Sequence, residues 1–361
     1  MQTFFIVAIL ALGFLITFQI AKASEYVAVL RGEERSRKQT NKINGFLLLA
    51  FLIIGLIGVY YCNEQLKGKI LGAPDSDHGV LVDRMLYITL GLTFFVFVVT
   101  QVALFWFSYK YQESDTRKAF YYPHNNKLEL IWTVIPAITL TVLVGFGIFY
   151  WFKITGDAPK DAMVVEVTGK QFGWEFRYPG KDKTLGKKYY KLIDDAKGNP
   201  LGQVWEDPAN HDDIYATTDL HLVVNRPVKM IINAKDVIHD VGLAHFRMKM
   251  DAVPGTPTTM WFTPTKTTKE KRKETGNPDF VYEISCDQMC GKGHYSMRGT
   301  IIVETQEEYD QWMATQKPQY AVAFPPPAPA KADSSAVAPV AAGNTGATGA
   351  TPATTAPGGN H

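Results

Sequence analysis

The sequence predicts a membrane-anchored α + β protein, with N-terminal transmembrane helices followed by a Greek-key β-sheet domain. Three features predict this class. Long apolar runs are confined to the first 153 residues, short alternating runs separated by Gly and Pro follow, and the chain closes on a stretch rich in Pro, Ala and Gly. We therefore expect a transmembrane region at 1–158, a folded β domain at 159–316 and a disordered tail at 317–361.

Four segments are apolar enough to cross a bilayer, which takes about 20 residues of helix. They are residues 4–20, 46–61, 85–109 and 130–152. The last two reach that length, and the first two are shorter. The first segment could instead be a cleaved signal peptide ending at Ala21-Lys22-Ala23, but Met1–Phe5 lacks the basic residues of such a peptide. We expect all four helices to be retained.

The connection between the first two helices, residues 22–42, carries most of the topological information. It contains six basic residues, Lys22, Arg31, Arg35, Arg37, Lys38 and Lys42. Basic loops stay in the cytoplasm, so the N-terminus and everything after residue 153 should lie outside. We expect a multi-pass protein of the bacterial inner (cytoplasmic) membrane, with its β domain on the periplasmic face.

Seven stretches of the β domain alternate between apolar and polar residues, as half-buried strands do. They are residues 163–168, 171–178, 221–224, 228–232, 258–263, 281–285 and 299–304. Short strands of this kind favour a Greek-key sandwich or barrel. Residues 181–213 are polar and irregular and are predicted to be a surface insertion, and residues 307–316 a short helix.

A cluster of soft metal ligands lies between the last two predicted strands. Cys286, Cys290, His294 and Met297 are separated by three, three and two residues. Sulfur and imidazole suit copper, zinc or iron, and a Met favours copper. Two thiolates can bridge two copper ions if a second His, such as His239, joins them. A disulfide between the cysteines, or a tetrahedral zinc site with both histidines, remains an alternative.

This stretch resembles the binuclear copper (CuA) loop of cytochrome c oxidase subunit II, Cys-x-x-x-Cys-x-x-x-His-x-x-Met. Asp236-Val-Ile-His239 and Met250-Asp-Ala-Val-Pro-Gly255 also match that family, in its usual order. The resemblance runs from about residue 127 to about residue 304. It implies that residues 159–316 form an extracytoplasmic cupredoxin-like barrel that holds the copper loop.

The resemblance also implies a set of copper ligands. Cys286 and Cys290 would bridge the two coppers, and His239 and His294 would bind one copper each. The weak ligands would be the Met297 thioether on one copper and the Gln288 backbone carbonyl on the other. The family usually has Glu at the position of Gln288, where it also binds magnesium. A magnesium ligand from this chain is therefore doubtful.

Two further motifs resemble the same family. Residues 129–137 are similar to its Glu-x-Ile-Trp-Thr-x-x-Pro-Ala signature, in which the Glu lies at the mouth of a proton-uptake path into subunit I. An ordinary helix-start carboxylate would also explain Glu129. The aromatic run where electrons enter commonly reads Gln-Trp-x-Trp, and here it contains Phe172 and Trp174. Core packing would explain both aromatics as well.

The resemblance implies subunit II of a respiratory haem–copper oxidase. Such a subunit takes electrons from a c-type cytochrome and passes them to a haem in subunit I, where O2 is reduced to water and protons are translocated.

Haem and further copper are expected only in the partner subunit, and the chain contains no Cys-x-x-Cys-His haem attachment motif. Subunit I, other oxidase subunits and the lipid bilayer are the expected partners. A net charge of +2 gives no indication of nucleic-acid binding. Two other functions would also use a copper site of this kind: that of a nitrous-oxide reductase and that of a membrane-tethered copper chaperone.

Overall fold

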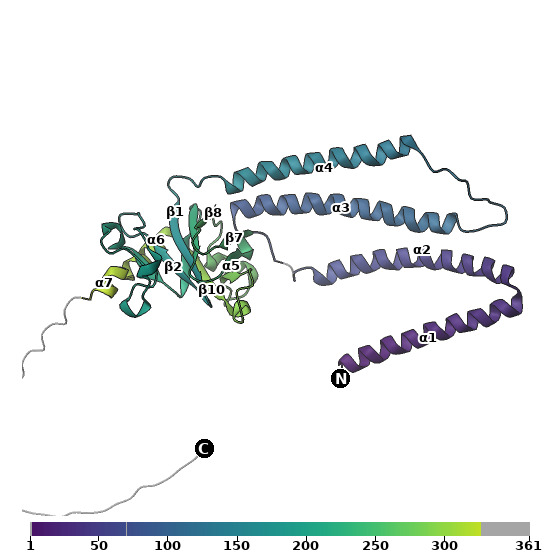
Figure 1. Cartoon of the computed structure of the whole chain (residues 1–361), viewed down its shortest axis with the longest axis horizontal. Coiled ribbons are helices and arrows are strands. Elements are labelled where there is room, and N and C mark those ends of the chain that lie inside the picture. The colour runs from purple at the N-terminus through teal and green to yellow at the C-terminus, as the bar shows by residue number, and fades with distance from the viewer. Residues whose placement is uncertain (1, 70, 326–361) are drawn as a thin grey trace, which may run out of the picture. The chain divides into compact units, whose positions relative to one another are not determined.

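Four long helices make up the N-terminal half of the computed structural model, which describes residues 2–69 and 71–325. They are α1 (Gln2–Arg31), α2 (Glu33–Leu66), α3 (Asp77–Lys110) and α4 (Asn126–Thr155). Each contains a stretch long and apolar enough to cross a membrane. Figure 1 shows α2, α3 and α4 running alongside one another. The predicted transmembrane helices are present, and each is longer than its apolar run.

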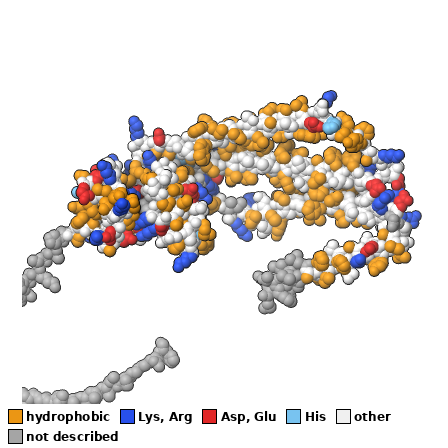
Figure 2. Space-filling view, viewed as in Figure 1, with side chains coloured by type: hydrophobic (Ala, Val, Ile, Leu, Met, Phe, Trp, Pro, Cys, Tyr) orange, Lys and Arg blue, Asp and Glu red, His pale blue; other side chains and the backbone are white. Residues whose placement is uncertain are grey.

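The first connection differs from the expected loop, because nearly all of residues 22–42 are helical. Helix α1 continues to Arg31 and α2 begins at Glu33, so only Gly32, with φ of 85°, separates them. The basic residues of this segment therefore lie on the last turns of α1 and the first turns of α2. Arg37 pairs with Glu113 at 3.1 Å, and Lys38 pairs with Asp115, which ties the start of α2 to the connection that follows α3. Figure 2 shows this charged cluster beside the otherwise apolar helix surfaces.

The β domain contains two five-stranded sheets. The first has the order β3 (Ile214–Ala216), β2 (Gly173–Tyr178), β1 (Met163–Lys170), β5 (Val228–Ala234) and β8 (Thr258–Phe262). The second has the order β4 (Asp219–Val223), β10 (Arg298–Glu304), β9 (Tyr282–Cys286), β6 (His239–Leu243) and β7 (Met248–Ala252). Fully buried apolar side chains from both sheets, such as Val165, Phe176, Leu222 and Ile284, form the core. The expected architecture of helices followed by a cupredoxin-like β domain is confirmed.

Three strands and a helix before β9 were not predicted. Strands β3, β6 and β7 and helix α5 (Thr268–Thr275) all lie outside the seven predicted stretches. All five residues of β6 are buried, so this strand shows no alternation of apolar and polar residues. It nevertheless pairs with both β7 and β9 inside the second sheet.

The insertion at residues 181–213 is irregular, as expected, but it is anchored by a buried polar cluster. Its short 3-10 helices are η1 (Tyr190–Leu192), η2 (Asp195–Lys197) and η3 (Pro208–Asn210). The Arg177 guanidinium, which is 1% exposed, donates to Glu166 at 3.0 Å and to Asp213 at 3.0 Å. A buried guanidinium needs such partners, so the insertion completes the domain as well as covering its surface.

The folded part of the chain extends beyond the expected boundary at residue 316. Helix α6 (Gln306–Thr315) corresponds to the predicted terminal helix, and a further helix, α7 (Gln319–Ala323), follows it. The backbone N–H of Gln319 donates to Asp213 O at 2.8 Å, and its side chain donates to Gly198 O at 2.7 Å. Residues 317–323 therefore pack on the insertion, and the tail from residue 326 onward lies outside the described residues.

Candidate metal centre

The predicted copper loop connects two neighbouring strands of the second sheet. Strand β9 ends at Cys286 and β10 begins at Arg298, and the loop between them contains the short helix η5 (His294–Ser296). The loop closes at its base, where Cys286 N donates to Met297 O at 3.1 Å. The sulfurs of Cys286, Cys290 and Met297 are thereby held at the end of the sheet, and all three residues are buried.

Side chains from the loop and from β6 meet in one cluster, in which the sulfur–sulfur and the two sulfur–imidazole distances are equal. Cys286 Sγ lies 3.8 Å from Cys290 Sγ and 3.8 Å from His239 Nδ1. Cys290 Sγ in turn lies 3.8 Å from His294 Nδ1 and 3.9 Å from Met297 Sδ. Each thiol therefore has one imidazole nitrogen beside it, and the two thiols lie between the two imidazoles.

A carbonyl oxygen completes the group of potential ligands. The backbone oxygen of Gln288 lies 3.1 Å from Cys286 Sγ. All six residues that the resemblance names as ligands are thus brought together. Together they offer more donor atoms than the four that a structural zinc site takes.

The two cysteines do not form a disulfide in this structure. Both thiols are free, and their separation of 3.8 Å is far longer than a disulfide bond of about 2.05 Å. Burial, followed by the neighbouring Cys286 thiol, raises the pKa of the Cys290 thiol to about 11. The thiolate form of Cys290 therefore needs a nearby cation, and a soft metal ion between the sulfurs would supply it.

His239 is positioned by its second ring nitrogen. Its side chain is fully buried, and Nε2 hydrogen-bonds to Asp236 Oδ1 at 2.8 Å, which leaves Nδ1 facing Cys286. Asp236 Oδ2 accepts from the backbone N–H of Gln171 at 2.7 Å. Burial favours a higher pKa for Asp236, but the bonds from Gln171 and His239 outweigh it and lower the pKa. Asp236 is therefore a carboxylate that fixes the orientation of a metal ligand.

The segment before β2 lies against the copper loop. Gln171 Nε2 donates to Cys290 O at 2.6 Å, and the Phe172 ring lies so close to Gly293 that a Cβ there would come within 2.5 Å of it. Gly291 faces the same ring, 3.0 Å from where its own Cβ would stand. The loop thus needs glycine at both positions for this close approach. Gln171 was not among the predicted site residues, although it belongs to the run that resembles the family.

The two predicted aromatics differ in their access to solvent. Phe172 is 37% exposed, whereas Trp174 is 4% exposed and packs edge-on against His239 with ring centroids 6.2 Å apart. Both therefore lie beside the cluster, but of these two only Phe172 presents an accessible face.

Glu129 lies apart from the cluster, in the first turn of α4. Its Oε1 accepts from the backbone N–H of Asn125 at 3.3 Å, while the Asn125 side chain caps the helix through Leu128 N at 3.1 Å. The opposite end of α4 contacts the β domain, where Trp261 Nε1 donates to Gly156 O at 2.8 Å. Glu129 therefore lies at the end of α4 that is distal to the β domain.

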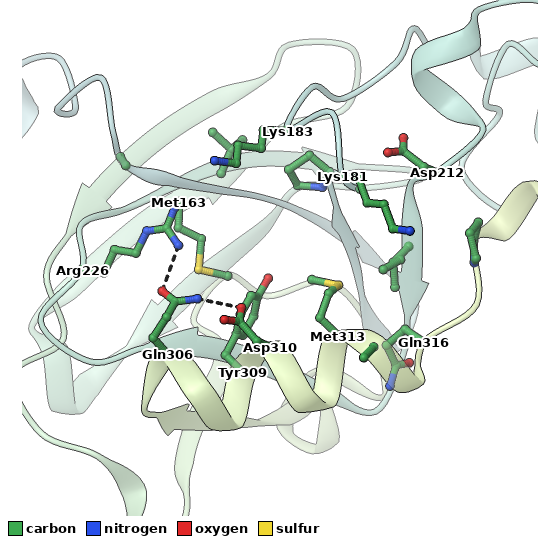
Figure 3. Close-up of a pocket in the computed structure, with 17 residues that line it drawn as sticks. Met163, Lys181, Lys183, Asp212, Arg226, Gln306, Tyr309, Asp310, Met313 and Gln316 are labelled. Atoms are coloured by element: carbon green, nitrogen blue, oxygen red, sulfur yellow. Dashed lines mark hydrogen bonds between the residues drawn. The ribbon is translucent and has the colours of Figure 1, made fainter.

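A separate pocket of about 720 Å³ lies between β1, the insertion and α6 (Figure 3). Arg226 donates to Gln306, which donates to Asp310 along the pocket wall. The residues that line it include Met163, Lys181, Lys183 and Met313, and they share no member with the copper-ligand candidates. The pocket therefore belongs to a different surface of the described domain.

Two family models match the chain. Residues 74–149 match the transmembrane domain of cytochrome c oxidase subunit II, and residues 163–306 match the periplasmic domain of the same subunit. The first match covers most of α3 and α4, and the second covers the β domain through β10. Helices α1 and α2 lie outside both matched ranges.

Individual relatives carry the same description. The alternative cytochrome c oxidase subunit 2 of Bradyrhizobium diazoefficiens is 33% identical over 267 residues, which are 74% of this chain and 91% of that protein. The cytochrome c oxidase subunit 2 of Cereibacter sphaeroides is 28% identical over 238 residues, 63% of this chain and 72% of that protein. A solved periplasmic domain of subunit II of cytochrome oxidase from Bradyrhizobium japonicum is 26% identical, with a TM-score of 0.31, over 45% of this chain and 99% of that one.

The two family-model matches agree with the order of elements in the structure. A membrane anchor precedes a periplasmic domain that gathers His239, Cys286 and Cys290 within 4.8 Å of one another, a set suited to copper. The chain is thus a membrane-bound component of an oxidoreductase, with its copper domain on the periplasmic side. Given two matching family models and a relative that is 33% identical across 91% of its length, the chain belongs to the cytochrome c oxidase subunit II family.

Proposed function

We propose that this chain is the electron-accepting subunit of a respiratory haem–copper oxidase and holds a binuclear CuA centre. One observation carries the proposal: two thiols lie 3.8 Å apart, and each lies 3.8 Å from the Nδ1 atom of a different histidine. Such a pattern suits two metal ions that share both sulfurs and take one imidazole each. A single-copper site would have no use for the second thiolate.

The surrounding residues keep this ligand set rigid. Asp236 orients His239, the Gln171 side chain holds the backbone of Cys290, and the backbone bond between Cys286 and Met297 closes the loop. Copper bound there would accept one electron at a time and release it again. A ligand cage that hardly moves lowers the cost of each electron transfer, and hydrogen bonds around the ligands tune the potential.

Electrons from a c-type cytochrome would enter on the exposed side of the loop. Phe172 is accessible there, and Met289 and Tyr295 within the loop are 74% and 83% exposed. Exposed apolar side chains of this kind suit a transient protein contact and a π surface against a haem edge. We assign electron uptake to Phe172, with Trp174 as a buried support behind His239.

The partner in the membrane would be subunit I, which holds the haem that receives each electron and the site that reduces O2 to water. Glu129 would serve proton uptake toward that subunit, since it lies at the end of α4 distal to the copper domain and is half-buried. Gln288 contributes its backbone oxygen near Cys286, and its amide side chain offers no carboxylate to magnesium.

The test is the spectrum and metal content of the full-length chain purified with its oxidase. Two copper ions per copy of this chain, with the hyperfine pattern of one electron shared by two copper nuclei, are expected. The pattern of a single copper nucleus, or one zinc per chain, would refute the proposal. Cys290→Ser should abolish the shared-electron pattern, whereas His245→Ala, which alters a histidine outside the ligand set, should preserve it.

A further inference from the structure

One strand connects the proposed copper site to a transmembrane helix. Strand β6 begins at the ligand His239 and ends at Leu243, where the short helix η4 (Ala244–Phe246) continues the chain. Five residues of β strand span about 13 Å between the first and last Cα at ~3.3 Å per residue. Strand β6 is therefore a short, direct path along the backbone from η4 to His239.

The residue after η4 makes an ion pair with α3. Arg247 Nε donates to Asp83 Oδ1 at 2.9 Å, and Nη2 donates to Asp83 Oδ2 at 3.2 Å. The same guanidinium donates to Gly72 O at 2.7 Å and to Ala244 O at 2.8 Å. A planar guanidinium suits such a forked contact better than a lysine would. We call the Arg247–Asp83 pair with these two carbonyl bonds the η4 clamp.

The backbone conformation of Arg247 shows that its side chain matters. Arg247 has φ of 56° and ψ of 32°, the left-handed region that favours glycine. An arginine in this conformation is less stable than a glycine unless contacts of its side chain offset the strain. The four hydrogen bonds of the Arg247 side chain to α3, to the linker before it and to η4 offset that strain.

Backbone contacts around the clamp leave η4 little freedom to move. Asp75 N donates to His245 O at 2.9 Å, and Ser76 Oγ donates to Phe246 O at 2.6 Å. A Cβ on Gly79 would stand 2.9 Å from Phe246 O, so α3 approaches η4 as closely as a glycine permits. Asp75 is itself buried and pairs with the buried Lys271 at 2.9 Å. The start of α3 is thus embedded in the β domain.

We propose that the η4 clamp is a positioning device that fixes the proposed copper site relative to the membrane helices. Arg247 and Asp83 contact neither the copper loop nor a ligand side chain and act through β6. The inference rests on the proposed function, because the position matters for the transfer of an electron from copper to the haem of subunit I. A loosened clamp would leave the copper site intact but let its distance to that haem vary.

The first test is Arg247→Gly in the assembled oxidase. Glycine suits the left-handed backbone, so this substitution removes the guanidinium without adding strain. Lys183→Gly is the matched control, because Lys183 also has a positive φ, of 60°, and lies in the insertion. We expect unchanged copper content, copper spectrum and reduction by the cytochrome in both variants. Transfer from copper to haem should slow severalfold in Arg247→Gly alone, because the rate of electron transfer falls steeply as the distance between the two centres increases.

The second test measures position directly. Cys62 is exposed near the end of α2 and offers a thiol for a nitroxide label, whereas the other two cysteines are buried and, under the proposed function, would be held by copper. Pulsed EPR should give a narrow distance distribution between label and copper in the parent chain and in Lys183→Gly. The distance distribution should be broader in Arg247→Gly and in Asp83→Asn. The second variant removes the charge of Asp83 but keeps the volume of its side chain.

The outcomes separate the two proposals. An intact shared-copper spectrum with an unchanged transfer rate and an unchanged distance distribution in Arg247→Gly would overturn the clamp alone. A parent oxidase without that spectrum would overturn the proposed function, and this inference with it.

Discussion

Asp236 and His239 form a hydrogen bond of 2.8 Å that determines which ring nitrogen faces the cysteines. Because Asp236 accepts from Nε2, the lone pair of Nδ1 is available toward Cys286. Asp236 is in turn held by the backbone of Gln171, which precedes β2. The pair therefore connects the first sheet to a proposed metal ligand in the second.

Removing the charge of Asp236 should weaken metal binding without unfolding the domain. Asp236→Asn leaves one side-chain oxygen and no charge, so the side chain can no longer accept from both Gln171 N and His239 Nε2. Loss of such a partner typically costs 10–100-fold in metal affinity, so a loss of about tenfold or more is expected. Competitive titration of the full-length chain with a copper chelator measures it. Asp161→Asn, on an exposed residue before β1, is the control. Equal affinities in the two variants would mean that Asp236 does not orient the ligand.

Phe172, just before β2, and Trp174, within β2, should affect different properties: the rate of electron uptake and the stability of the domain. Phe172→Ala should slow reduction of copper by the cytochrome, because it removes the exposed π surface, and should change stability little. Trp174→Ala should lower the free energy of unfolding by about 3–5 kcal/mol, the usual cost of a large buried cavity. Stopped-flow reduction and thermal unfolding of each variant separate the two effects. A larger kinetic defect in a stably folded Trp174→Ala would reverse the assignment.

Much of this site was predictable because its ligands are close in sequence. The spacing from Cys286 to Met297 lies within one loop, and the alternating flanks predicted β9 and β10. The contacts that hold the loop could not be predicted, since Gln171 and Cys290 are 119 residues apart. Strand β6 was missed because it is buried on both faces and so shows no alternating pattern. The helical residues within 22–42 were missed because their hydropathy is low, although the backbone is helical on both sides of Gly32.

Glu175 should make the stability of the β domain sensitive to acid. Burial alone would raise its pKa, but bonds from Lys170 at 2.7 Å, from Lys235 at 2.5 Å and from the Tyr215 hydroxyl at 2.6 Å outweigh burial and lower the pKa from its usual 4.5. A group whose pKa is lower in the folded state stabilises the fold above its unfolded pKa, and that contribution is lost as the pH falls through the folded pKa.

The corresponding measurement is the free energy of unfolding of the metal-free chain between neutral pH and about pH 3, the range that spans the unperturbed pKa of Glu. We expect a plateau above the usual pKa of Glu175 and a decline below it in the parent chain. Glu175→Gln should be less stable on the plateau and should show a smaller decline. Glu283→Gln, at an exposed carboxylate that pairs loosely with Arg298 at 3.7 Å, should follow the parent curve. An identical decline in Glu175→Gln would assign the acid sensitivity to other carboxylates.

Glu129 provides the last prediction, because its position supports two different roles. Its bond to the Asn125 backbone is what a helix-start carboxylate makes, and that role is worth about 0.3–1 kcal/mol. On this reading Glu129→Ala lowers stability slightly and leaves turnover unchanged. Proton uptake predicts instead that Glu129→Ala slows the proton-coupled reduction of the oxygen site in the assembled oxidase, while copper content and cytochrome oxidation by the copper site stay normal.

The conservative variant Glu129→Asp decides between the two roles. A shorter carboxylate still collects protons at the end of α4, so it should recover part of the rate, whereas Glu129→Gln keeps a hydrogen-bond acceptor for Asn125 N but cannot ionise. Single-turnover kinetics of the four chains measures this directly. If Glu129→Gln turns over like the parent, the side chain serves only to start the helix. If it is slow and Glu129→Asp is partly restored, the ionisable group itself is required, because both variants retain an acceptor for the helix start.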